Sequence, residues 1–157
     1  MKSNSNEDEE DEIEISELQT LPIEDKDLTN TITWSLDEDY NLTINGSGQM
    51  KDFTAEGAPW HAYAPLISTV TISEGIENIG RYAFYECGFT SIIIPSTVTI
   101  IGKGAFENSG LTTIETNQAL EQIEDNAFHN QNAMTGVTLT NNLKTIKTIP
   151  EELKEKI

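Results

Sequence analysis

Hydrophobic residues recur at a constant spacing through the central part of the chain. A hexapeptide that ends in Ala-Phe occurs three times, 22 residues apart each time, at residues 79–84, 101–106 and 123–128. A shorter apolar or β-branched segment keeps the same spacing, at residues 70–72, 92–94, 114–116 and, after one inserted residue, 137–139. A 22-residue period with two apolar segments in each repeat predicts a stack of coils, which is a solenoid.

Each coil is expected to contribute its shorter segment as one strand of a small parallel sheet, with the first and third residues in the core. Residues one period apart lie above one another at about 4.8 Å in such a stack. This spacing predicts two buried ladders, one of Phe84, Phe106 and Phe128 and the other of Ile79, Ile101 and Ile123. Gly80 and Gly102 are expected to permit a positive φ or a close backbone approach, although Glu124 holds the same place in the third repeat.

The segments on either side of the repeats are expected to close the ends of the stack. Alternating residues at 31–36 and 40–44 predict a β-hairpin, and two prolines bound a short helical turn or tight loop at 59–66. At the other end, an apolar stripe predicts a helix and consists of Ile149, Leu153 and Ile157. The expected organisation is an acidic flexible leader at 1–27, an N-terminal cap at 28–66, repeats at 67–146 and a C-terminal capping helix at 147–157.

The repeats resemble those of a known family. The pattern Ile-Gly-x-x-Ala-Phe, followed by Cys-Gly-Phe-Thr-Ser-Ile-Ile-Ile-Pro at residues 87–95, is similar to the BspA-type (Treponema pallidum-type) leucine-rich repeats of bacterial surface proteins. The segment from Trp34 to Trp60 is also similar to the lead-in that often precedes those repeats. The resemblance covers about residues 31–146. It implies a right-handed leucine-rich-repeat solenoid on a secreted or cell-wall protein that adheres to host or bacterial proteins, and it implies no catalytic residue.

The charge of the chain limits the partners that we expect. The formal net charge at pH 7 is −18, and residues 1–27 hold 11 acids and two lysines. With nine Lys and Arg and no basic cluster, the field repels phosphate backbones and anionic lipids, which disfavours nucleic-acid and membrane partners. The acidic leader cannot bury enough apolar surface to order itself. Because the first residues lack an apolar signal segment, an extracellular or cell-surface location implies that an export signal is absent from this chain.

No catalytic or metal-binding constellation is recognisable in the sequence. His61 lies in the helical turn before the repeats, and His129 follows Phe128 at a place that Tyr and Glu hold in the other repeats. The single cysteine, Cys87, excludes a disulfide framework and is interpreted as a small residue of a coil turn. The acidic run at 37–41 lacks the Gly and Glu that an EF-hand needs at its sixth and twelfth positions. We therefore expect no enzyme activity, no cofactor and no metal.

The outward positions of the predicted strands form a candidate binding surface, which we call the strand face. It consists of Thr69, Thr71, Ile93, Thr113, Glu115 and Thr138. The face is mostly polar and has no aromatic ring, which makes it a poor platform for carbohydrate or nucleic acid. Four strands at about 4.8 Å spacing give a sheet roughly 15 Å wide and on the order of 150–200 Å² of face. That area is well below the ~800 Å² per partner of a standard interface.

Two functions remain open on the sequence. The first is a non-enzymatic cell-surface or secreted protein-binding module of the adhesion type, with a contact surface centred on Ile93. The second is a structural spacer without a dedicated ligand, which self-associates through an exposed end of the stack. In the second case the strand face is an ordinary solvated surface.

Overall fold

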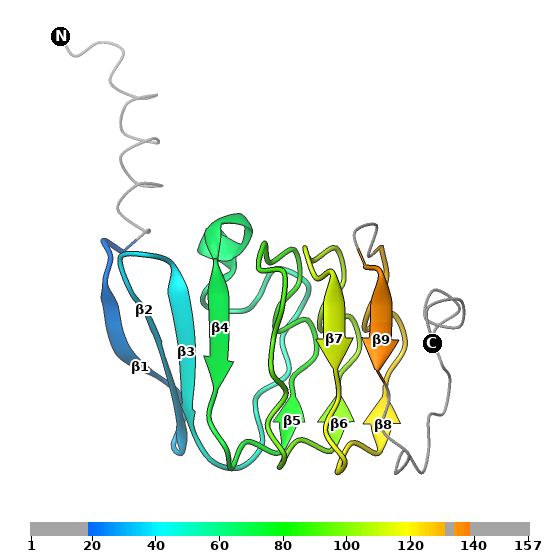
Figure 1. The fold of residues 1–157 in the computed structure, drawn as a ribbon. Coiled ribbons are helices and arrows are strands. Elements are labelled where there is room, and N and C mark those ends of the chain that lie inside the picture. Colours follow the sequence, from blue (N-terminus) through cyan, green and yellow to red (C-terminus); the bar gives the residue numbers. More distant parts are fainter. Residues whose placement is uncertain (1–18, 131–133, 139–157) are drawn as a thin grey trace, which may run out of the picture.

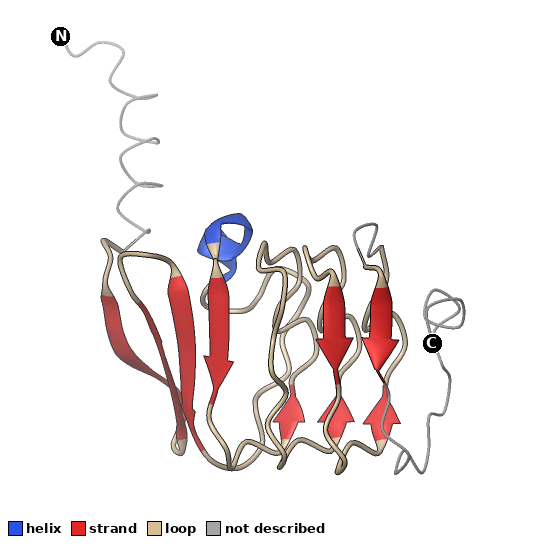
Figure 2. Cartoon of the chain, in the orientation of Figure 1, coloured by secondary structure: helices blue, strands red, loops and turns tan. Residues whose placement is uncertain are grey.

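Short β-strands and tight turns make up almost all of the described chain (Figure 1, Figure 2). The computed structural model describes residues 19–130 and 134–138, and residues 136–138 by their backbone only. The strands are β1 (Ile23–Thr29), β2 (Ile32–Leu36), β3 (Asn41–Gly46), β4 (Thr69–Ile72), β5 (Asn78–Ile79), β6 (Ile100–Ile101), β7 (Thr113–Glu115), β8 (Gln122–Ile123) and β9 (Gly136–Thr138). One 3-10 helix, η1 (His61–Leu66), precedes β4.

The N-terminal part forms a four-stranded sheet in the order β1-β2-β3-β4. The predicted hairpin is confirmed, because β2 and β3 pair antiparallel with Trp34 opposite Ile44. The Asp37 carboxylate closes the turn by accepting the backbone N–H groups of Asp39 and Asn41, both at 2.9 Å. β3 then pairs in parallel with β4. The hairpin therefore continues into the first strand of the repeats and shares a sheet with it.

The predicted boundary of the acidic leader was wrong for residues 23–27. These residues belong to β1, which pairs antiparallel with β2. The reason is that Ile23 is buried in the core and Leu28 packs against it, so the strand gains apolar contacts that the average composition of the segment conceals. Residues 1–18 of the predicted leader lie outside the described residues.

The two predicted ladders are confirmed. Ile79 lies beside Ile101, and Ile101 beside Ile123, in the parallel three-stranded sheet β5-β6-β8, which the sequence did not predict as a sheet. Phe106 stacks on Phe84 and Phe128, with ring centroids 5.5 and 5.3 Å apart. All six of these residues are buried. The equal spacing of the repeats therefore produces equal stacking of their side chains.

Trp60 extends the phenylalanine ladder into the N-terminal part. Its ring stacks on that of Phe84 with centroids 6.1 Å apart, and its indole N–H donates a hydrogen bond of 2.7 Å to the Ala83 carbonyl oxygen. The predicted helical turn is present as η1, which begins at the next residue. Trp60 thus occupies the place of a ladder phenylalanine one coil earlier.

The turns of the coils explain the glycines and their exceptions. Gly80 permits a close approach, because a Cβ atom there would lie 2.0 Å from the Lys51 carbonyl oxygen. Gly102 is similar, with 2.8 Å to the Arg81 backbone nitrogen, and neither glycine has a positive φ. Glu124, at the same place in the third repeat, accepts a hydrogen bond of 2.9 Å from the backbone N–H of Lys103. The close-approach explanation for the two glycines is therefore confirmed.

The expectation of one parallel sheet through all the repeats was wrong. β4 belongs to the N-terminal sheet, whereas β7 and β9 form a separate parallel pair. Between them, residues 92–94 contribute only an isolated bridge from Ile93 to Glu115. The right-handed winding of the coils stays a prediction. The predicted capping helix at 147–157 and the repeat residues 139–146 lie outside the described residues.

Candidate binding face

Five of the six residues predicted for the strand face have described side chains. Thr69 and Thr71 on β4, Ile93, and Thr113 and Glu115 on β7 are all exposed. The backbone register aligns Ile93, Glu115 and Thr138 in one row across neighbouring strands. The side chain of Thr138 lies outside the described residues.

The N-terminal sheet makes the strand face wider than the sequence suggested. Thr43 on β3 lies directly beside Thr71 on β4, and the Thr69 hydroxyl donates a hydrogen bond of 2.6 Å to the Asn41 side-chain oxygen. With β2 and β3 added at about 4.8 Å per strand, the face grows from roughly 15 to roughly 25 Å in width. Its area remains well below the ~800 Å² per partner of a standard interface.

The sheet is interrupted in the middle of the strand face. β4 pairs with β3 on one side, and no backbone hydrogen bond joins its residues 69–72 to residues 91–94 of the next coil. The same two coils are joined on both sides of this interruption. The Gly88 N–H donates to the Ala64 carbonyl oxygen at 2.9 Å, and the Thr97 hydroxyl donates to the Ile76 carbonyl oxygen at 2.6 Å. The coils therefore separate locally, at the strands alone.

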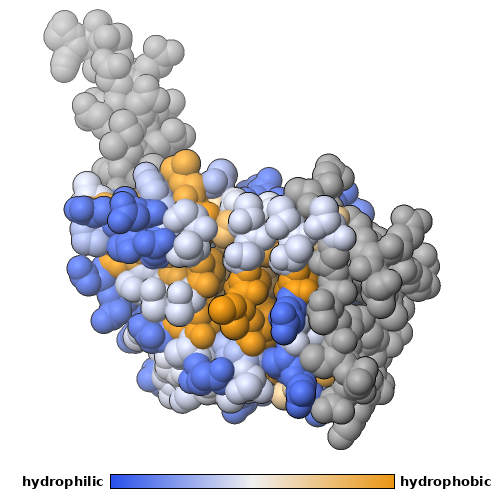
Figure 3. All heavy atoms as spheres, viewed as in Figure 1, coloured by the Kyte–Doolittle hydropathy of each residue, from blue (hydrophilic) through white to orange (hydrophobic). Residues whose placement is uncertain are grey.

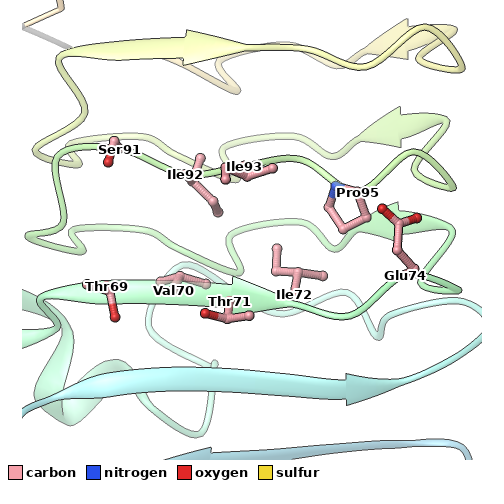
Figure 4. Close-up of a pocket in the computed structure, with 9 residues that line it drawn as sticks. All are labelled: Thr69, Val70, Thr71, Ile72, Glu74, Ser91, Ile92, Ile93 and Pro95. Atoms are coloured by element: carbon pink, nitrogen blue, oxygen red, sulfur yellow. The ribbon is translucent and has the colours of Figure 1, made fainter.

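A cavity of about 350 Å³ occupies this interruption, and we call it the groove (Figure 4). It is lined by Thr69, Val70, Thr71, Ile72, Glu74, Ser91, Ile92, Ile93 and Pro95. The core side chains beneath it are slightly uncovered, since Val70, Ile72 and Ile92 are each 7% exposed whereas Leu42 and Ile44 on β3 are fully buried. The groove thus gives solvent access to the edge of the hydrophobic core.

Ile93 is the most exposed large apolar side chain among the described residues. It is 87% exposed, and Leu66 at the end of η1 follows with 56%. Figure 3 shows an apolar area in the middle of this face, bordered by polar residues. The corresponding residues of neighbouring repeats are Thr71 and Glu115. An isoleucine at a place that otherwise holds polar residues marks this repeat as different.

Negative charge borders the groove. Glu74 lies at the end of the groove beside Pro95 (Figure 4). The hydroxyl of Ser96 donates to the Glu74 carboxylate at 2.7 Å and its backbone N–H at 3.1 Å, and these hydrogen bonds hold the pKa of Glu74 below its ordinary value. Glu115 lies beside Ile93 in the backbone register. The groove lining contains no Lys or Arg.

Within the described residues, His61 and Cys87 lie in different surroundings, one at an exposed contact and the other in the core. The His61 ring stacks on Tyr85, and its Nε2 lies 3.2 Å from a carboxylate oxygen of Glu86. Cys87 is buried, and this burial together with the nearby Glu86 charge raises the pKa of its thiol far above the ordinary value. Among residues 19–130 and 134–138, no group of three His, Cys, Asp or Glu side chains is arranged to hold a metal ion.

The stacked coils, the aligned ladders and the exposed strand row define a leucine-rich-repeat fold. A family model described as BspA type Leucine rich repeat region (6 copies) matches residues 61–149. Because this range covers more than half of the sequence, the chain belongs to that family. The family consists of repeat modules for protein interaction, typically on surface or secreted proteins, and is not a known family of enzymes.

A solved structure supports the same fold. The chain is similar to a leucine-rich repeat protein from Eubacterium ventriosum, with 24% sequence identity and a TM-score of 0.52. The match covers 73% of this chain and 43% of the other, so this chain spans less than half the length of that protein. A search of curated proteins gives no match. In the part of the chain that the structure describes, no helix has the length and hydrophobicity needed to cross a bilayer.

The sequence indicated Ile93 but not the groove beside it. The three consecutive isoleucines at 92–94 stand out, because the other repeats have a polar residue in the middle of this segment. The loss of pairing between β4 and residues 91–94 has no comparable signal, since the core-facing positions of both segments are apolar, as in a pair of joined strands. Glu74, Ser91 and Pro95 were therefore not predicted as parts of a shared site.

Proposed function

We propose that the chain is a non-enzymatic protein-binding module of a cell-surface or secreted protein, and that it binds its partner through the strand face. The contact residues of this proposal are Thr69, Thr71, Ile93, Thr113, Glu115 and Thr138. The partner is a protein on the surface of a host or bacterial cell, and the chain presents the face as part of a right-handed solenoid.

The observation that carries the proposal is the exposure of Ile93 beside the groove. A large apolar side chain that is 87% exposed gains free energy when a partner covers it. Exposed apolar groups that gather beside a hollow and are bordered by polar residues are typical of protein contact sites. The family supports the same reading, because its members are repeat modules for protein interaction.

Site-specific photocrosslinking tests the contact surface. A photoreactive amino acid at position 93 should yield a covalent adduct with another protein when cells that naturally produce the chain are irradiated. The same amino acid at Glu121, an exposed residue away from the strand face, serves as the control. Absence of an adduct at positions 71, 93 and 113 would remove the strand face as the contact surface.

The proposed location is tested separately. A membrane-impermeant amine reagent applied to intact cells should label the chain, since it contains lysines and is expected outside the membrane. A cytosolic protein labelled only after lysis is the control. Protection of the chain in intact cells and its absence from the culture medium would contradict the location.

The alternative function is a structural spacer that self-associates. Sedimentation velocity over a wide concentration range distinguishes the two, because a spacer that joins copies of itself sediments faster as its concentration rises. A constant monomeric sedimentation coefficient is expected here, because the charge of −18 on each copy opposes close contact between copies.

A further inference from the structure

We propose that the groove between β4 and residues 91–94 receives an extended, cationic segment of the partner protein, which places one apolar side chain beside Ile93. This inference rests on the proposed function and specifies the chemistry of the partner. The proposed segment has three features, namely an extended backbone, an apolar anchor and positive charge. A separate observation supports each of them.

The free edge of β4 accounts for the extended backbone. The Ser73 N–H donates to the Ile44 carbonyl oxygen at 2.9 Å, so this residue directs its backbone groups toward β3. Backbone groups alternate between the two edges of a strand, and Val70 and Ile72 accordingly direct theirs toward the groove. These groups have no partner in the next coil. An extended segment laid along the groove can pair with them, as in other cases of strand addition.

The dimensions and lining of the groove account for a single apolar anchor. A volume of about 350 Å³ lies at the lower end of the range for ligand pockets, which suits one large side chain rather than a packed helix. Val70, Ile72, Ile92 and Ile93 line the groove, and the first three also belong to the hydrophobic core. An aliphatic or aromatic side chain inserted here would cover core residues that the interrupted sheet leaves partly exposed.

The charges at the groove select a cationic segment and disfavour a second copy of this chain. Glu74 lies at one end of the groove, and Glu115 lies beside Ile93 in the register of the strands. Because the hydrogen bonds from Ser96 lower its pKa, Glu74 stays ionised under physiological conditions. A second copy would bring another net charge of −18 to this acidic surface, whereas lysines or arginines next to the anchor would meet opposite charge.

The test measures fluorescence anisotropy of three short labelled peptides with the full chain. The first peptide has one leucine flanked by lysines, the second has glycine in place of the leucine, and the third has glutamates in place of the lysines. The leucine-lysine peptide is expected to bind more tightly than either of the others. Its affinity should fall as ionic strength rises, because exposed charges are screened by salt.

Variants of the chain locate the binding. Ile93→Ala should weaken binding of the leucine-lysine peptide about tenfold, because much of the apolar contact is lost. Glu74→Gln should weaken it about two- to fivefold and reduce its dependence on salt. The matched controls are Leu66→Ala, another exposed apolar side chain, and Glu121→Gln, another exposed acid outside the groove. Both controls should bind the peptide like the original chain, and thermal unfolding should show that all four variants fold.

The outcomes separate this inference from the proposed function. Equal binding of the leucine and glycine peptides, equal binding of the lysine and glutamate peptides, or full affinity in a folded Ile93→Ala variant would overturn the inference. Failure of the leucine-lysine peptide to bind would overturn it as well. In each of these cases an adduct formed through position 93 in cells would still support the protein-binding function, with a partner of different chemistry.

Discussion

The same coils are closely joined on their phenylalanine side and separated on part of their strand side. On the phenylalanine side, the N–H groups of Phe84 and Phe106 donate to carbonyl oxygens of the next coil at 2.8 Å, and the rings stack at 5.3 to 5.5 Å. On the strand side, β4 has no backbone hydrogen bond to residues 91–94. The comparison shows that a repeat can be held in place by one side of its coil while the other side opens.

Competition between two sets of contacts explains the opening. β4 pairs over its whole length with β3, so its position follows the N-terminal sheet. Residues 91–94 follow the later repeats instead, because Ile93 bridges to Glu115 and their coil is joined to the next one through Ile101 and Phe106. β4 and residues 91–94 separate where the N-terminal sheet meets the later repeats. A groove can therefore form at this junction without any residues inserted between the repeats.

The largest effect is expected when a ring is removed from the middle of the ladder on the phenylalanine side. Phe106→Ala should lower the free energy of unfolding by about 3–5 kcal/mol, since it leaves a cavity between two stacked rings. Ile93→Ala on the open side should change it by less than about 0.5 kcal/mol because that side chain is exposed. Urea denaturation of both variants gives the two values. Similar losses in the two variants would contradict the contrast between the sides.

A smaller loss is expected from crowding a coil turn. Gly80→Ala would place a methyl group 2.0 Å from the Lys51 carbonyl oxygen, and the resulting displacement should cost about 1–3 kcal/mol. Gly57→Ala is the matched control, because its new methyl group would meet mainly the Thr54 hydroxyl, which can rotate away. Chemical denaturation compares the two. Equal stability of both variants would show that the turn tolerates a Cβ atom.

The buried thiol of Cys87 predicts a pH dependence of stability. Its pKa is raised in the folded chain, so the folded state holds this proton at a pH where the unfolded state releases it. The contribution is complete below the ordinary thiol pKa of about 8.5 and is lost above it, at up to about 1.4 kcal/mol per pH unit. Denaturation between about pH 8 and 9.5 should show this decline, and a Cys87→Ala variant should show a shallower one. Identical slopes of stability against pH in the original chain and the variant would show that Cys87 does not cause the decline.

The smallest expected effect is a gain in stability at a left-handed turn residue. Glu86 has a φ of 62°, and the equivalent residues Asn108 and Asn130 have 58° and 59°. Asparagine tolerates this conformation better, so Glu86→Asn should stabilise the chain by about 0.5 kcal/mol despite the lost, partly exposed contact with His61. Glu107→Asn, at a place without positive φ, is the control in thermal unfolding. A loss of stability at position 86 would show that the contact outweighs the strain.

Parts of the candidate site were predictable because they depend on neighbours along the chain. The exposure of Thr69, Thr71 and Glu115 follows from alternation in short strands. The central place of Ile93 follows from comparing its segment with the equivalent segments of other repeats. The groove and the part played by Glu74 depend on how two distant segments pair, and periodicity carries no information about that. The burial of Ile23 was missed for the same reason.

The sequence by itself determined the repeat, its 22-residue period, the two ladders and the polar outer row. Each of these follows from which residue types recur at equal spacing, and equal spacing in a stack of coils brings equivalent side chains together. Only the tertiary structure decided that β4 pairs with the N-terminal hairpin and that the sheet opens beside it. That choice depends on the balance between backbone pairing in one sheet and side-chain stacking in the next coil. The hydrophobic pattern is the same for either outcome, so it could not distinguish them.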